Sequence, residues 1–90
     1  MEPGYHWDDK KAVANAAKHR VDFADAIAVF DDPLAVTIPD PDALGKPRFV
    51  TLGLDASRRV LVVVYAEGAG RIRIISARRA TGKERRYHAI

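Results

Sequence analysis

The sequence predicts a small α+β fold with two N-terminal helices, a four-stranded, mainly antiparallel sheet and a short C-terminal helix. Three observations support this order. Apolar residues recur at helical spacing up to about residue 31, they alternate with a period of two between residues 48 and 79, and turn signals separate the alternating runs. Because 90 residues can enclose one hydrophobic core, we expect residues 1–90 to form a single domain.

The first predicted helix spans Asp9–His19. Asp8 is its N-cap, and the apolar Trp7 before it is placed to act as a hydrophobic staple. Its apolar stripe is expected to consist of Val13 and the neighbouring alanines, with Asn15 on the opposite, polar face. This narrow stripe buries little area per turn, so the helix has to pack closely against the rest of the domain.

The second helix is predicted to begin after Asp22 and to end before Pro33, because a residue that precedes proline disfavours helical backbone angles. Four strands and a final helix follow. The strands are expected at Leu34–Ile38, Arg48–Leu54, Arg59–Glu67 and Arg71–Arg78. Thr81 and Glu84 have the spacing of a capping box, which predicts a short helix that reaches Tyr87.

Charge is distributed unevenly along the chain. Residues 1–45 contain four basic and nine acidic side chains, whereas residues 46–90 contain eleven basic and three acidic ones. The densest basic segment contains Arg71, Arg73, Arg78, Arg79, Lys83, Arg85 and Arg86, with Glu84 as its only acid. Arginines in such a cluster suit the binding of nucleic-acid phosphates, and a solvated basic surface is the alternative interpretation.

Alternation along the last strand gives a candidate cleft. In a regular strand Ile74, Ser76 and Arg78 point to one side, so the face that begins in the core ends in a hydroxyl and a guanidinium. A bulge near Ile75 would bring Arg73 onto the same side as Ser76 and Arg78. A backbone-bonded hydroxyl at the end of a strand is the alternative interpretation of Ser76, since no histidine or acid accompanies it in sequence.

Proton transfer near neutral pH favours histidine, and His19 is the most suggestive of the three histidines. The alternatives are a packed or dipole-facing His19 at the end of its helix and a solvated Lys18 beside it. No spacing among the histidines or aspartates matches a metal site, and no cofactor is expected. The chain has no cysteine, no apolar leader and no run long enough to span a membrane, so we expect a cytoplasmic protein.

Nearly the whole chain resembles the BrnT family of bacterial type II toxins, which have a RelE-like fold. The residues that carry the resemblance are Trp7-Asp8, Lys10, Asn15, Lys18-His19, Val21, Phe23, Ala26, Val29-Phe30, Asp32-Pro33, Arg48, Gly53, Val60–Tyr65, Arg73–Thr81, Glu84 and Tyr87. Arg20 stands where many members have glycine, a residue that suits a left-handed helix cap.

The resemblance implies an RNA-cleaving toxin that a cognate BrnA-like antitoxin neutralises in a hetero-oligomer. The ribbon-helix-helix part of that antitoxin would bind operator DNA, which the toxin would contact only through its partner. Together with the pattern of charges, the resemblance leads to a hypothesis of metal-independent cleavage, in which the RNA 2′-hydroxyl attacks the neighbouring phosphate.

Roles for individual residues follow from this hypothesis. Arg78, with Arg73 as helper, would stabilise the charge that develops on the phosphate, His19 or Lys18 would transfer protons, and Ser76 and Tyr87 are further catalytic candidates. The candidates for RNA binding are Arg48, Arg71, Arg79, Lys83, Arg85 and Arg86. Two alternatives use the same basic face: a module that binds RNA or DNA without cleaving it, and a docking surface for an acidic protein.

Overall fold

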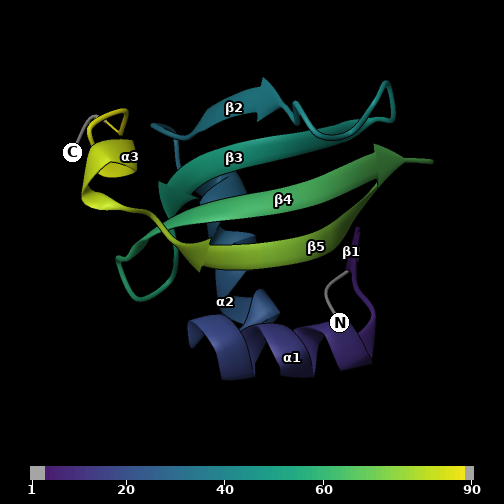
Figure 1. Ribbon diagram of the computed structural model, residues 1–90, viewed down its shortest axis with the longest axis horizontal. Coiled ribbons are helices and arrows are strands. Elements are labelled where there is room, and N and C mark those ends of the chain that lie inside the picture. The colour runs from purple at the N-terminus through teal and green to yellow at the C-terminus, as the bar shows by residue number, and fades with distance from the viewer. Residues whose placement is uncertain (1–3, 89–90) are drawn as a thin grey trace.

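A computed structural model describes residues 4–88 of the chain, as an N-terminal helical segment followed by a sheet (Figure 1). The elements in chain order are β1 (Tyr5–His6), α1 (Asp9–His19), α2 (Phe23–Ala26), the 3-10 helix η1 (Ile27–Asp31), β2 (Val36–Pro39), β3 (Arg48–Leu54), β4 (Val60–Gly68), β5 (Arg71–Arg79) and α3 (Gly82–Arg85). The α+β class is confirmed. No helix within residues 4–88 is long and apolar enough to cross a membrane.

The sheet has five strands in the order β1-β5-β4-β3-β2. Strands β2 to β5 pair antiparallel as neighbours along the chain, whereas β1 pairs parallel to β5 through Tyr5 with Ile72 and His6 with Arg73. The prediction of four strands is therefore wrong by one, and the sheet is mixed. Two residues are too few to show alternation, so β1 is visible only through its long-range pairing.

The helices begin where their caps predict. The Asp8 carboxylate accepts a hydrogen bond from the backbone N–H of Lys11 at 3.0 Å, and α1 has the predicted bounds. The second predicted helix keeps its α form only over α2 and continues as η1, ending at Asp31 before Asp32-Pro33. At α3 both bonds of the capping box are present, but the helix itself ends at Arg85, two residues before Tyr87.

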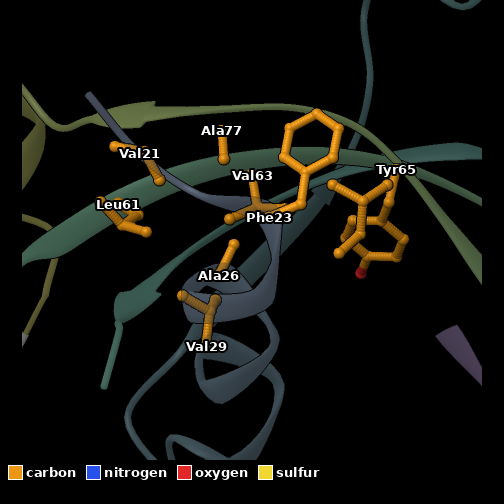
Figure 2. Close-up of a cluster of buried hydrophobic side chains, with 9 residues drawn as sticks. Val21, Phe23, Ala26, Val29, Leu61, Val63, Tyr65 and Ala77 are labelled. Carbon is orange, nitrogen blue, oxygen red and sulfur yellow. The ribbon is translucent and has the colours of Figure 1, made fainter. Parts of the chain in front are cut away.

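Helix α2 and the segment η1 cover one face of the sheet, called here the helix face, and α1 lies along the edge formed by β5 (Figure 1). Figure 2 shows the core on this face, where side chains from the second helical segment meet those of β4 and β5. Its buried residues are Val21, Phe23, Ala26, Val29, Leu61, Val63, Tyr65, Ile74 and Ala77. Removal of this apolar surface from water supplies the main driving force for folding.

The α1 stripe differs from the predicted one. Val13 is 72% exposed and Asn15 is buried, so the face of α1 that packs against the domain is formed by Asn15 together with small or half-buried side chains. The apolar periodicity of an alanine-rich helix is weak, and a buried asparagine in it cannot be distinguished by hydropathy from a solvated one.

The opposite face of the sheet, called here the open face, carries a much smaller cluster. Leu52, Val60 and Val62 are buried there, and Val50 and Leu54 pack against them partly exposed. In Figure 1 α2 lies behind the sheet, and no helix crosses in front of β3 and β4, since α3 sits at one end. This face therefore presents both apolar and charged side chains to solvent.

Candidate functional site

Strand β5 is interrupted by a bulge at Ile75. Val64 of β4 pairs with Ser76, and the next residue of β4, Tyr65, pairs with Ile74, so Ile75 has no partner on β4. The bulge considered from the sequence is confirmed. The regular-strand alternative, in which Ile74 and Ser76 share a side, is wrong, because Ile74 lies in the core of the helix face.

The bulge brings three predicted catalytic side chains onto the open face. Arg73, Ser76 and Arg78 pair with residues of β4 that alternate with the core residues Leu61, Val63 and Tyr65. The β4 partners are Ala66, Val64 and Val62. Arg71 lies on the same side of β5, next to the hairpin that joins it to β4.

Arg48 of β3 extends this row of cations. It pairs with Ala66, which in turn pairs with Arg73, so the two arginine backbones are two strand spacings, about 10 Å, apart on the open face. The Arg48 guanidinium forms an ion pair with Asp40 at 3.3 Å. Of the predicted RNA-binding residues, Arg48 and Arg71 thus share a face with the predicted catalytic arginines.

A bidentate ion pair fixes the Arg78 guanidinium. Its Nη1 and Nη2 donate to the two carboxylate oxygens of Glu84, both at 2.8 Å, and Nη1 also donates to the Arg79 carbonyl at 3.3 Å. The hydrogen bond from Arg78 is the largest cause that lowers the pKa of Glu84 to about 2, and the pair also raises the pKa of Arg78. Three of five N–H groups are used, so within the described residues Nε–H and one Nη2–H of Arg78 remain available for an anion.

Glu84 therefore has a second role besides capping α3, which its sequence spacing does not reveal. The capping box uses its Oε1 to accept from the Thr81 N–H at 2.9 Å, and the same carboxylate holds Arg78. A carboxylate with a pKa near 2 is a weak base, so Glu84 is suited to positioning Arg78 rather than to removing a proton at neutral pH. The capping-box spacing was a visible signal for α3, but not for the ion pair with β5.

Tyr87 and the bases of α3 border the same face. Tyr87 is 70% exposed and lines an apolar groove with Val62 of β4. Lys83, Arg85 and Arg86 are exposed. Within the part of the chain that the structure describes, Arg71, Arg73, Arg79, Lys83, Arg85 and Arg86 form no ion pair. Six cations without ion-pair partners suit the binding of a polyanion such as RNA, because each neutralised phosphate releases condensed counterions.

Lys18 and His19 lie at the end of α1, beside the edge of the sheet, and Arg79 points to the helix face. α1 packs against β5 and the two run in the same direction (Figure 1), so His19, about 6 Å beyond Asn15 along the helix, lies near the end of β5. Arg79 is there too, and its pairing with Leu61 puts it on the helix face. The structure thus places Lys18 and His19 at the edge of the sheet and Arg78 on the opposite side of β5.

His6 is a further titratable group on the open face, and no sequence pattern pointed to it. It pairs with Arg73, while its neighbour Tyr5 faces the other way and contacts Phe30 with ring centroids 5.4 Å apart. Partial burial lowers the pKa of His6, and the positive charges of Arg71 and Arg73 lower it further. Both effects favour the neutral imidazole of His6, which lies beside an arginine of the site.

Known proteins share the sequence pattern and the fold of this chain. Residues 7–84 match the family profile described as the ribonuclease toxin BrnT of type II toxin-antitoxin systems. The crystal structure of the Brucella abortus ribonuclease toxin BrnT superimposes with a TM-score of 0.67 and 27% sequence identity, covering 83% of this chain and 92% of that one. No curated protein matches the sequence.

The family match extends over most of the chain and includes α1, every strand from β2 to β5 and the capping box of α3. The residues that carried the resemblance in sequence, such as Asn15 and the Arg73–Thr81 segment, form the contact between α1 and β5 and the bulged strand of the site. The chain belongs to the BrnT ribonuclease toxin family of type II toxin-antitoxin systems.

Proposed function

We propose that this ribonuclease toxin cleaves RNA on the open face of its sheet, by metal-independent attack of a 2′-hydroxyl on the adjacent phosphate. A new bond forms between the 2′-oxygen and phosphorus while the bond from phosphorus to the 5′-oxygen breaks. A base takes the 2′-proton and an acid gives a proton to the leaving 5′-oxygen. The products are a 2′,3′-cyclic phosphate and a 5′-hydroxyl.

The observation that carries this proposal is the bulge at Ile75, because it puts Arg73, Ser76 and Arg78 on one surface. Negative charge grows on the non-bridging phosphate oxygens in the transition state, and a preorganised cation there lowers the barrier. Glu84 holds the Arg78 guanidinium in a fixed plane with two N–H groups available, so Arg78 is assigned the main stabilising role. Arg73 is the second cation.

Proton transfer is assigned to the titratable groups around this surface. His6 lies beside Arg73, and its lowered pKa favours the neutral form that a general base requires. Lys18 and His19 at the sheet edge and Tyr87 after α3 are the other candidates. Binding of the flanking RNA backbone is assigned to Arg48, Arg71, Lys83, Arg85 and Arg86, whereas Arg79 faces the helix side of the sheet and is left out of this assignment.

The test is cleavage of a defined RNA by the purified toxin in EDTA. We expect cleavage with cyclic-phosphate ends and a loss of about 10²-fold to 10³-fold in rate for Arg78→Ala, the loss typical of removing one transition-state contact. Lys10→Ala removes an exposed charge at the start of α1 that has no role in the proposed site, so it should leave the rate unchanged. Thermal melting of both variants checks their folding.

Three outcomes would contradict the proposal. Equal rates for Arg78→Ala and the parent would remove Arg78 from the mechanism. Loss of cleavage in EDTA that added Mg²⁺ restores would contradict metal independence. Salt-sensitive RNA binding without any product at high toxin concentration would favour the non-enzymatic alternative.

A further inference from the structure

An apolar groove on the open face has no covering element among residues 4–88. It has a volume of about 300 Å³. Strands β2, β3 and β4 supply its floor, and α3 together with Tyr87, two residues after its end, supplies one wall. The lining residues are Val36, Ile38, Val50, Leu52, Val62, Glu84 and Tyr87. Val36 is 42% exposed, Ile38 is 53% exposed and Tyr87 is 70% exposed, whereas every core residue of the helix face is below 5%.

The groove lies at an unpaired edge of the sheet. β2 is the last strand in the order, so its outer backbone groups have no partner strand in the described part of the chain. Its side chains Val36 and Ile38 point into the groove, since they pair with Leu52 and Val50 of the open face. Exposed apolar side chains next to an open strand edge are typical of a surface that another polypeptide covers.

The surrounding charges decide among possible occupants. Lys83, Arg85 and Arg86 on and after α3 are exposed and unpaired within the described residues, and Arg73 lies on the same face. A second copy of this chain would bring two such basic surfaces together, which like-charge repulsion disfavours. An RNA backbone would pair with the cations but would leave the valines and the isoleucine of the groove exposed to water. A polypeptide whose apolar side chains are flanked by carboxylates would fill the groove and also pair with the neighbouring cations.

We propose that this groove docks an acidic, amphipathic segment of the cognate antitoxin. Its apolar side chains fill the space between Ile38 and Tyr87, and its carboxylates face the bases of α3. The groove adjoins Arg78, which pairs directly with the groove residue Val62. A bound segment therefore covers the approach to Arg78. This last consequence, inhibition by covering the site, rests on the proposed function, whereas docking itself does not.

The test is a binding titration of the toxin with the antitoxin encoded by the neighbouring gene, without RNA present. We expect Ile38→Lys to weaken binding at least tenfold, because a charge replaces an apolar contact. Val13→Lys is the matched control, since Val13 is an equally apolar, 72% exposed residue on α1. The double change Arg85→Glu and Arg86→Glu should also weaken binding and reduce its dependence on salt.

Unchanged antitoxin affinity for Ile38→Lys would overturn the proposal. So would an Ile38→Lys change that affects only self-association of the free toxin in sedimentation, or only its affinity for RNA, because the groove would then belong to a second copy or to RNA. Ile38→Thr keeps the β-branched shape and tests the same contact if the lysine variant does not fold. Failure of the Arg78→Ala cleavage test leaves these binding results unaffected, so the two proposals can fail separately.

Discussion

The Asn15 side chain takes the place of a neighbouring strand beside Ala77. Its Oδ1 accepts from the Ala77 N–H at 3.1 Å, and its Nδ2 donates to the Ala77 carbonyl at 2.8 Å and to the Val21 carbonyl at 3.0 Å. β1 reaches β5 only at Ile72 and Arg73, so Asn15 satisfies backbone groups that the sheet leaves open further along. α1 is thereby fixed to β5 between Ser76 and Arg78.

Replacement of Asn15 should destabilise the fold and the site together. In Asn15→Ala, three buried backbone groups lose their partners, and we expect the free energy of unfolding to fall by about 2 to 3 kcal/mol. Urea unfolding followed by circular dichroism measures this loss. Val13→Ala, on the exposed side of the same helix, is the control and should change stability by less than about 0.5 kcal/mol.

The variant Asn15→Asp tests whether the hydrogen bonds of Asn15 or its size alone stabilise the fold. The carboxylate still accepts from Ala77 but cannot donate to the two carbonyls, so it should not restore stability above its pKa. An aspartate variant as stable as the parent at pH 7 would contradict this account of Asn15.

Gly53 is required by the close approach of β3 and η1. A Cβ at this position would lie 2.9 Å from Val29 Cγ1 and 3.3 Å from Asp32 Oδ2. We expect Gly53→Ala to lower the free energy of unfolding by about 1 to 3 kcal/mol, as overpacking does. Gly68→Ala is the control, because nothing lies within 4 Å of its added Cβ and its backbone has an ordinary φ. Equal urea midpoints for the two variants would contradict this prediction, because η1 would then move to make room for the Cβ without a loss of stability.

The local parts of this fold were predictable, and its long-range parts were not. The bounds of α1 and β3 and the capping box of α3 follow from signals within a few residues, so they match the prediction. β1 and the burial of Asn15 depend on partners more than 60 residues away. A short window of sequence contains no information about such partners. The close approach of Val29 in η1 to Gly53 in β3 is likewise a tertiary contact that local sequence patterns do not show.

For the site, the sequence identified the arginines but not their arrangement. Arg73 and Arg78 stand out by charge, yet their shared face depends on a bulge that alternation alone does not require. Glu84 was predicted as a capping residue, but its ion pair with Arg78 became apparent only in the folded structure. His6 gave no signal, because its position beside Arg73 results from the parallel pairing of a two-residue strand.

The ion pair of Glu84 should make stability depend on acid pH. The pKa of Glu84 is lowered from 4.5 to about 2 in the folded state. A depressed pKa means that the stabilisation is fully present above pH 4.5 and is lost as the pH falls towards 2. We expect the parent to lose stability over this window more steeply than Glu84→Gln, which has no charge to titrate. Urea midpoints at pH 6, 4 and 2.5 test this, and parallel pH curves for the two proteins would contradict it.

Arg20 strains the end of α1. It caps the helix with φ of 59° and ψ of 33°, in the left-handed region, and its N–H bonds the Ala16 carbonyl at 3.0 Å. Glycine adopts this conformation without a steric penalty, so Arg20→Gly should stabilise the fold by about 1 kcal/mol. For a domain of this size that corresponds to a rise of about 4 to 8 °C in Tm. Ala17→Gly, within the same helix, should instead lower Tm, and a fall for both variants would show that the Arg20 side chain itself stabilises the fold.

The position of His6 predicts how its imidazole titrates. Partial burial disfavours the imidazolium, and the charges of Arg71 and Arg73 disfavour it further, so NMR titration of the His6 ring should give a pKa below 6.5. Arg71→Gln removes one repelling charge, which should move this pKa upwards. Lys10→Gln, at the start of α1, removes a cation of similar exposure and should leave it unchanged. If His6 is the base, cleavage falls as the pH drops through the lowered pKa, and Arg71→Gln shifts that fall to higher pH in parallel with the NMR curve. A pH profile of cleavage that does not follow the His6 titration curve would exclude His6 as the base. Lys18, His19 and Tyr87 would then remain as the candidates for proton transfer.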